Sequence, residues 1–141
     1  MIGGTAVGGE RGSTLPLLLG YVVLALALLV VCVCATDLHL AQKRLDAVAD
    51  AAALAGADGF TVASVDGVAV LRLSDAAVRE QAAAVLAAEE GGRAELVSAG
   101  TPDGTSARVT VRAVWAPPLL ADAVPPLVEL RSTATSRTVL R

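Results

Sequence analysis

The chain carries one long apolar run close to its first residues. No charged residue stands between Arg11 and Asp37, and residues 15–35 are apolar apart from small residues and one tyrosine. At about 1.5 Å per residue, a helix of this length spans a hydrocarbon core of about 30 Å. The pattern predicts a transmembrane helix over 13–36, the span, after a Gly-rich leader over 1–12.

A cleaved secretory signal peptide is the alternative interpretation of this run, because Val33 and Ala35 suit a small-residue cleavage site. The run is longer than the usual signal core of about 7 to 15 residues, so a retained anchor is favoured. Lys43 and Arg44 follow the run closely. The positive-inside rule, taken alone, would therefore place the rest of the chain in the cytoplasm.

An amphipathic pattern continues after the run without an intervening Gly or Pro. Apolar residues recur at steps of three and four, while Gln42, Lys43, Asp46 and Asp50 take the other side. This spacing predicts a stalk helix over 37–57, continuous with the span. The apolar positions, our candidate helix-packing residues, are Leu38, Ala41, Leu45, Val48, Ala52 and Ala55. Because half of them are Ala, the stripe can approach closely either its own head or neighbours in a multi-subunit bundle.

The remaining residues, 58–141, form the head, which begins with a predicted hairpin and helix. Residues 60–65 and 68–73 flank an Asp-Gly dipeptide, which is typical of a two-residue hairpin turn. Ser74 then offers a cap for a second helix that closes near residue 90 at a pair of glycines.

Further strands complete the predicted head. Residues 93–99 and 106–115 are separated by a Thr-Pro-Asp-Gly turn sequence, and 127–140 is a last strand after an apolar loop bracketed by two Pro-Pro pairs. Apolar residues alternate with Arg and Thr in 106–115, which indicates an antiparallel sheet with one covered face. The fold class is α+β: a long N-terminal transmembrane and stalk helix, packed on a small antiparallel sheet with a second helix.

Composition and charge narrow the function. The 141 residues suffice for one small domain beside a membrane segment, and the apolar fraction is mostly Ala, Val and Leu. The net charge of -3 is spread along the chain without a basic stripe, so we expect no nucleic-acid partner. Cys32 and Cys34 both lie in the apolar run and point to nearly opposite sides of a helix, so they cannot bridge each other.

Residue types that commonly form catalytic or metal sites are few in this sequence. The one histidine, His39, has no second histidine or free cysteine outside the apolar run with which to build a metal or nucleophilic site. Ser64, Ser98 and Ser132 have no histidine to activate them, and the Glu89–Glu90 pair closes a helix at a Gly-rich turn. We therefore expect no enzymatic activity, no catalytic residues, no metal and no cofactor.

Three features occur together: Arg-Gly-Ser-Thr at 11–14, the apolar run, and Gln-Lys-Arg-Leu-Asp-Ala-Val-Ala-Asp-Ala-Ala-Ala-Leu-Ala-Gly-Ala at 42–57. This order resembles the TadE/TadG-like proteins of bacterial tight-adherence (Flp, type IVb) pilus systems, in particular their short actinobacterial versions. The resemblance implies a pilin-like fold and a leader cut after Gly12, with Ser13 as the new N-terminus. Leu17 stands where processed members often carry Glu.

The resemblance also implies a function. It predicts a non-enzymatic minor pilin or pseudopilin-like subunit, or an assembly factor, of a Tad/Flp-type pilus or related secretion system. Its partners would be the membrane and other membrane subunits of that system, in a hetero-oligomer formed through helix packing. It would cross the inner (cytoplasmic) membrane once with the head extracytoplasmic, against the charge rule above. A signal-peptide-cleaved, secreted binding domain is the alternative.

Overall fold

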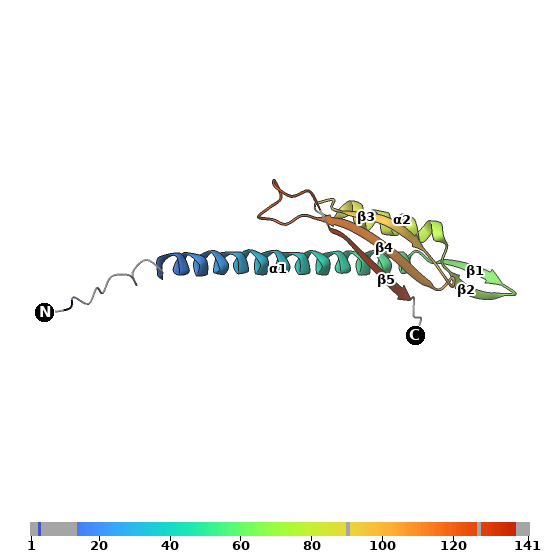
Figure 1. The fold of residues 1–141 in the computed structure, drawn as a ribbon. Coiled ribbons are helices and arrows are strands. Elements are labelled where there is room, and N and C mark those ends of the chain that lie inside the picture. Colours follow the sequence, from blue (N-terminus) through green and yellow to red (C-terminus); the bar gives the residue numbers. More distant parts are fainter. Residues whose placement is uncertain (1–2, 4–13, 90, 127, 138–141) are drawn as a thin grey trace. The chain divides into compact units, whose positions relative to one another are not determined.

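The computed structural model describes residues 3, 14–89, 91–126 and 128–137. The chain folds as two compact units, one up to Thr36 and one from Asp37 onward. The helices and strands are shown in Figure 1. They are α1 (Thr14–Asp58), β1 (Thr61–Val65), β2 (Val68–Arg72), α2 (Asp75–Ala88), β3 (Ala94–Gly100), β4 (Ser106–Trp115) and β5 (Val128–Arg137). The α+β class is confirmed, with a long apolar N-terminal helix, a second helix and small antiparallel sheets.

The hairpin of β1 and β2 forms where the Asp-Gly dipeptide predicts it. The two strands pair antiparallel from Thr61↔Arg72 to Val65↔Val68. Asp66 and Gly67 both have positive φ, 52° and 79°. A two-residue turn with two positive φ angles matches the right-handed twist of the strands, which explains why Asp-Gly is favoured there.

The second helix begins at its predicted cap. The Ser74 hydroxyl accepts a hydrogen bond from the Ala77 amide at 3.2 Å, which satisfies one of the free amides of the first turn of α2. α2 ends at Ala88, slightly before the predicted end near residue 90. The Glu89 amide closes the last turn on the Leu86 carbonyl at 3.3 Å.

The larger sheet has the order β3-β4-β5 and is antiparallel throughout. β4 and β5 pair without a break from Ser106↔Arg137 to Trp115↔Val128, whereas the register of β3 shifts between Leu96 and Ser98. The predicted alternation along β4 is confirmed, because Val109, Val111, Ala113 and Trp115 are buried or half-buried, while Arg108, Arg112 and Val114 on the other side are exposed.

The outward face of this sheet carries polar cross-strand pairs. The Arg112 guanidinium lies 2.7 Å from the Glu95 carboxylate, and the hydroxyls of Thr110 and Thr133 are 2.9 Å apart. Such exposed pairs contribute little to stability, about 0.2 to 1 kcal/mol each. The opposite face of the sheet therefore holds the fold together.

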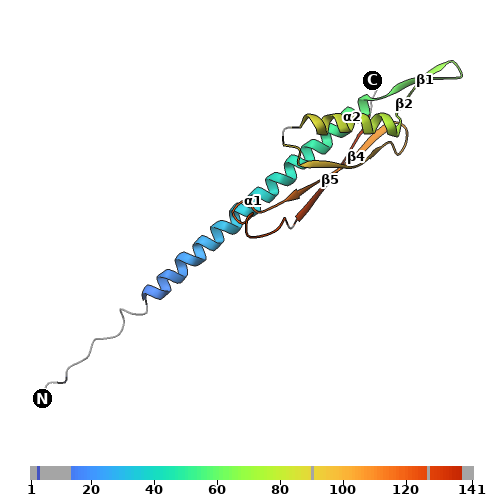
Figure 2. The same cartoon turned by 90° about the horizontal axis from the view of Figure 1, so that it is seen from above.

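One hydrophobic core joins that inner face to both helices of the second unit. Figure 2 shows α1 and α2 running beside the sheet. The core residues are mostly small or β-branched, so the elements approach one another closely. The buried apolar side chains are Leu45, Ala49, Ala52, Ala53, Ala57, Leu73, Val78, Ala82, Ala99, Ala107, Val109, Val111, Leu130 and Ala134.

Candidate functional site

Groups with catalytic chemistry are scattered in the described part of the chain. Among residues 14–89, 91–126 and 128–137, no three His, Cys, Asp or Glu side chains lie together as metal ligands would. His39 is exposed on α1, and Cys32 and Cys34 are free thiols in the apolar part of that helix. In the described part of the chain, His39 and the two cysteines are therefore not gathered into a metal site.

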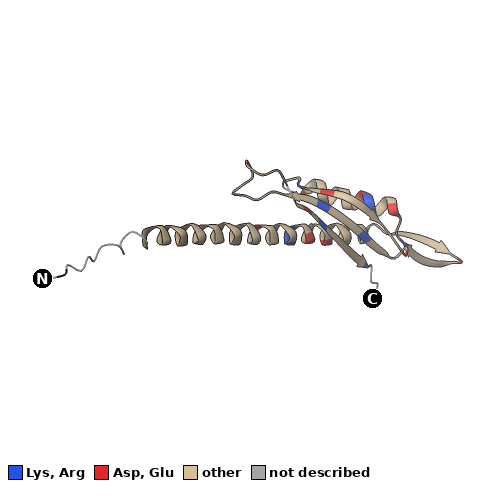
Figure 3. Cartoon of the chain, in the orientation of Figure 1, with Lys and Arg blue, Asp and Glu red and all other residues tan. Residues whose placement is uncertain are grey.

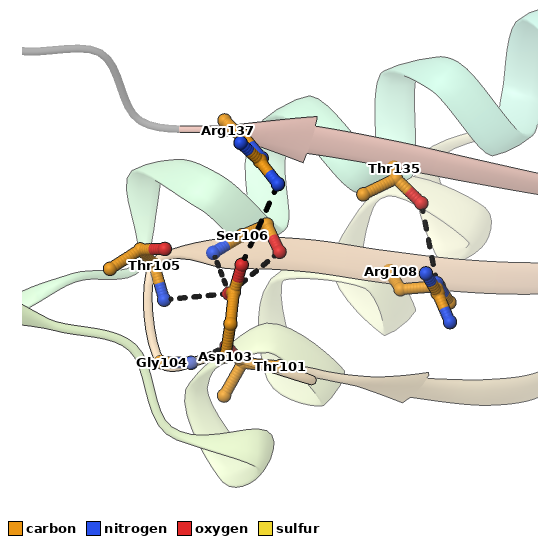
Figure 4. A network of polar contacts seen from close by, with 8 residues as sticks. All are labelled: Thr101, Asp103, Gly104, Thr105, Ser106, Arg108, Thr135 and Arg137. Atoms are coloured by element: carbon orange, nitrogen blue, oxygen red, sulfur yellow. Dashed lines mark hydrogen bonds and ion pairs between the residues drawn. The ribbon is translucent and has the colours of Figure 1, made fainter.

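The densest polar network surrounds Asp103, in the turn between β3 and β4 (Figure 4). One oxygen of its carboxylate accepts hydrogen bonds from the Thr105 amide at 3.0 Å and from the Ser106 amide and hydroxyl, both at 2.7 Å. The Ser106 hydroxyl, followed by the two amides, holds the pKa of Asp103 well below its usual range.

Further bonds tie this turn to its neighbours. The Thr101 amide donates to the Asp75 carboxylate at 2.7 Å, and the Gly104 amide donates to the Thr101 hydroxyl at 2.8 Å. The Leu73 amide donates to the Gly104 carbonyl at 2.9 Å. Each hydrogen bond in this network lies within the turn or joins it to the residues at the start of α2. The network therefore stabilises the loop.

The apolar part of α1 is a candidate membrane surface. Within residues 14–36 no side chain is buried and none is charged (Figure 3). Among the described residues, α1 is the one helix long and apolar enough to cross a membrane. The Thr36 hydroxyl donates to the Cys32 carbonyl at 2.8 Å, so even this polar side chain is satisfied within the helix. A helix that is apolar on all sides needs apolar surroundings.

The stalk contains the six candidate packing residues, and the structure places them differently. Leu45 and Ala52 are buried, at 4% and 0% exposure. Leu38 and Ala41 are partly buried against the same core, whereas Val48 and Ala55 lie half-buried at its edge. The residues that the three- and four-residue spacing missed, and that are buried there, are Ala49, Ala53, Gly56 and Ala57.

Gly56 marks the closest approach of the stalk to the head. A β-carbon added there would lie 2.9 Å from Val78 Cγ1 on α2 and 3.3 Å from the Ala107 methyl group on β4. Real β-carbons do not come so close to a neighbour, so the backbone of α1 can lie here only because this residue has no side chain. The inner side of the stalk is therefore built for contact with the head.

The outer side of the stalk also carries small and aliphatic residues. Leu40, Ala47, Ala51 and Leu54 are exposed and follow one another at helical steps of seven, four and three residues. Leu54 is 60% exposed and Leu40 is 47% exposed. We call these four residues the outer stripe; charged residues such as Lys43 and Asp50 flank it. It has the spacing of a helix-packing surface.

A polar contact holds the stalk against β5. The Asp46 carboxylate accepts hydrogen bonds from the Ser132 hydroxyl at 2.7 Å and from the side-chain amide of Gln42 at 2.9 Å. The Ser132 bond first, and then the Gln42 bond, lower the pKa of Asp46. The side-chain amide of Gln42 also donates to the Arg131 backbone carbonyl at 3.3 Å, so the side chains of Gln42 and Asp46 both connect the stalk to β5.

A second contact lies where the stalk begins. The Trp115 indole nitrogen, at the end of β4, donates to the Asp37 carboxylate at 2.8 Å. An open hollow of about 760 Å³ adjoins this pair, and Arg44, Glu89 and Arg93 are among its lining residues. The buried Oε2 atom of Glu89 has no hydrogen-bond partner in the described part of the chain.

Together these features fit a membrane-anchored protein: an exposed apolar helix continues into a stalk that is packed on an α+β head. Residues 12–59 match the family model described as "Tad: Putative Flp pilus-assembly TadE/G-like". The match confirms the resemblance inferred from the sequence, and it extends over the whole of α1. No curated protein and no solved structure matches the chain. The candidate processing residues Gly12 and Ser13 fall within the match but lie outside the described residues.

Proposed function

We propose that this chain is a non-enzymatic, membrane-anchored subunit of a Tad/Flp-type pilus or related secretion system, acting as a minor pilin-like component or as an assembly factor. The observation that carries the proposal is the Tad family match over 12–59, which includes all of α1, Thr14–Asp58, with its unburied apolar part. The chain crosses the inner membrane once, with its head on the extracytoplasmic side.

The mechanism is physical. The span confines the protein to the plane of the membrane, which raises the effective concentration of other membrane subunits around it. In lipid, helices associate through close van der Waals packing of small residues. Gly20 in the span offers such a position, because no atom lies within 4 Å of an added β-carbon there and the helix backbone is open to a neighbour. Partner subunits can pack there without rearrangement of the head.

The burial of the stalk residues supports two separate roles for the two sides of the stalk. Leu45 and Ala52, two of the candidate packing residues, are covered by the head. The outer stripe is exposed, and Val48 and Ala55 at the edge of the core are half-exposed. We therefore assign partner contact to the outer stripe and the half-exposed edge, and assign the buried side to attachment of the head.

Site-directed crosslinking in native membranes tests this assignment. Ala47→Leu and Ala51→Leu add bulk on the outer stripe without lowering helix propensity, so the protein should keep its abundance and lose crosslinks to partner subunits. Ala83→Leu, at an exposed position of α2, is the matched control and should leave both unchanged. If the two stalk variants crosslink to partner subunits as strongly as the unchanged protein, the outer stripe does not contact those subunits.

The orientation of the head has its own test. A cysteine at Asp66, exposed at the tip of the hairpin, should react with a membrane-impermeant thiol reagent in intact cells, after Cys32 and Cys34 are replaced by Ala. Labelling only after the membrane is broken would place the head in the cytoplasm, as the charges of Lys43 and Arg44 favour.

A further inference from the structure

We propose that the loop between β4 and β5, residues 116–126, is a second membrane contact, in which Trp115 lies at the level of the lipid headgroups and Leu119 and Leu120 enter the interface. The inference rests on the membrane anchoring of α1 proposed above and goes beyond it. It assigns a lipid surface as the partner of an exposed loop on the head.

The depth of Trp115 follows from its hydrogen bond to Asp37. Asp37 is the first charged residue after the apolar run, one residue beyond Thr36. The headgroup layer on each side of a bilayer is about 5 to 7 Å thick, or roughly three to five helical residues. Asp37 therefore lies in this layer, and so does the indole that donates to it at 2.8 Å. Tryptophan is enriched at this depth because its ring is apolar and its N–H is polar.

The loop leaves the head at this same end. Figure 1 shows it at the end of the head opposite to the β1–β2 hairpin, and Figure 2 shows the same arrangement from above. Leu119 is 58% exposed and Leu120 is 42% exposed, although both are large and apolar. They follow Trp115 by only four and five positions in the sequence. The loop therefore presents aliphatic side chains at the end of the head that carries Trp115 and Asp37.

The backbone of the loop is suited to an environment poor in water. The Leu120 amide donates to the Pro117 carbonyl at 3.1 Å, and the amides of Ala123 and Val124 donate to the Leu120 carbonyl at 2.9 and 2.8 Å. The four prolines that bracket the loop have no amide proton to satisfy. Pro117 is buried, which fixes the start of the loop on the head. These three bonds and the four prolines lower the number of amides that insertion into the interface would leave unpaired.

The charges near the loop indicate whether the contact depends on the charge of the lipid headgroups. Arg44 and Arg93 line the adjoining hollow together with Asp37 and Glu89, so both signs are present. The one charge in the loop itself is Asp122. This balance gives no preference for anionic lipids, and the contact should depend on the leucines.

Spin labels on the full chain test the contact. In a Cys32→Ala, Cys34→Ala background, single cysteines at Leu119, Asp66 and Leu24 are spin-labelled in proteoliposomes of phosphatidylcholine, alone or with phosphatidylglycerol. The accessibility of each label to oxygen and to a water-soluble nickel chelate then gives its depth. We expect lipid-like accessibility at Leu24 and Leu119 and water-like accessibility at Asp66, in both lipids.

The outcomes separate this inference from the proposed function. A water-like label at Leu24 would reject the membrane anchor itself. A lipid-like label at Leu24 with a water-like label at Leu119 would reject the loop contact alone. Lipid-like labels at both Leu119 and Asp66 would also reject it, because the head would then lie flat on the bilayer without using a particular end.

The single tryptophan provides a second readout without a label. Lipids brominated in their acyl chains should quench Trp115 fluorescence in the full chain. The double variant Leu119→Asp, Leu120→Asp should weaken that quenching, because the loop would no longer bring the head against the lipid, although the bond to Asp37 keeps the indole near the headgroups. Because both leucines are exposed, the variant should keep its thermal unfolding midpoint and its membrane attachment. Quenching that is equally strong in the variant would contradict the role of the leucines.

Discussion

The helix α1 presents two contrasting regions to its surroundings. Up to Thr36 its described residues carry no charge and none is buried, whereas from Asp37 onward one side is buried in the core and the other carries charges. Both regions draw on Ala, Val and Leu. They differ in residue size: the span is rich in Leu and Val on all sides, and the buried side of the stalk is largely Ala with one Gly.

This difference shows how one helix can meet two kinds of neighbour. Large aliphatic residues on every side expose apolar area that lipid can cover. Small residues on one side expose little area, but they let another backbone approach, as Gly56 does toward Val78. Hydropathy and the first charge at Asp37 separate the two regions, and residue size distinguishes the sides of the span from the buried side of the stalk.

The largest effect is expected from charges in the span. Leu24→Arg combined with Leu28→Arg should release the protein from membranes on alkaline extraction, because each Arg near the centre costs about 2.5 to 3.5 kcal/mol of insertion free energy. Leu54→Arg, on the exposed side of the stalk, should leave the protein in the membrane pellet. A double variant that stays in the pellet would show that residues 14–36 are not the anchor.

A smaller effect is expected on the buried side of the stalk. Gly56→Leu places a side chain where an added β-carbon already meets Val78 Cγ1 at 2.9 Å, so the free energy of unfolding should fall by about 1 to 3 kcal/mol. Ala51→Leu, on the outer stripe, should change it by less than about 0.5 kcal/mol. Denaturant unfolding of the full chain in detergent measures both. Equal effects of the two variants would refute the inner and outer sides assigned to the stalk.

The smallest effect is expected at the polar contact between stalk and β5. Ser132→Ala removes the main cause of the lowered pKa of Asp46, so that pKa should rise toward its ordinary value and stability at neutral pH should fall by about 1 kcal/mol. The pKa of Asp46 in the full chain can be followed by NMR. Ser136→Ala, on the same strand, is the control and should leave it unchanged.

The pH dependence of this contact has a defined sign. The folded-state pKa of Asp46 is lowered, so its stabilisation is fully present above the unfolded pKa of about 3.9. It is lost as the pH falls through the lower, folded-state value. Ser132→Ala should therefore reduce the loss of stability between neutral and acidic pH. An unchanged profile would mean that the Ser132 hydroxyl does not stabilise the ionised Asp46.

Much of the fold follows from local signals in the sequence. The Asp66-Gly67 turn and the Ser74 cap each depend on a few neighbouring residues, and both form where they are predicted. The alternation along β4 depends only on a period of two, and its buried residues follow it. Such features are predictable because their physical cause lies within one turn of chain.

The buried side of the stalk was harder to predict. Ala stands at 47, 49, 51, 52, 53, 55 and 57, so it occupies every side of the helix and the hydrophobic pattern gives little contrast. The predicted stripe included Val48 and Ala55, which are half-buried, and omitted Ala49 and Ala53, which are buried. The Gly56 position was the available signal, because a helical glycine often marks close packing.

The contacts between distant residues had no sequence signal. Trp115 and Asp37 are 78 residues apart, and Ser132 and Asp46 are 86 apart. Neither pair follows from periodicity, because each depends on how β4 and β5 cross the stalk. The candidate membrane loop was visible as an apolar segment between proline pairs, but its position beside Asp37 required the fold.

The most direct test of the central claim is the N-terminus and intact mass of the protein recovered from cell membranes. If residues 14–36 are a retained anchor, the membrane form should begin at Met1, or at Ser13 if the leader is cut after Gly12. Either mass keeps the whole apolar run in the mature chain. A protein that begins at Thr36, after Ala35, would contradict the account, because the run would then be a signal peptide and the head a secreted domain.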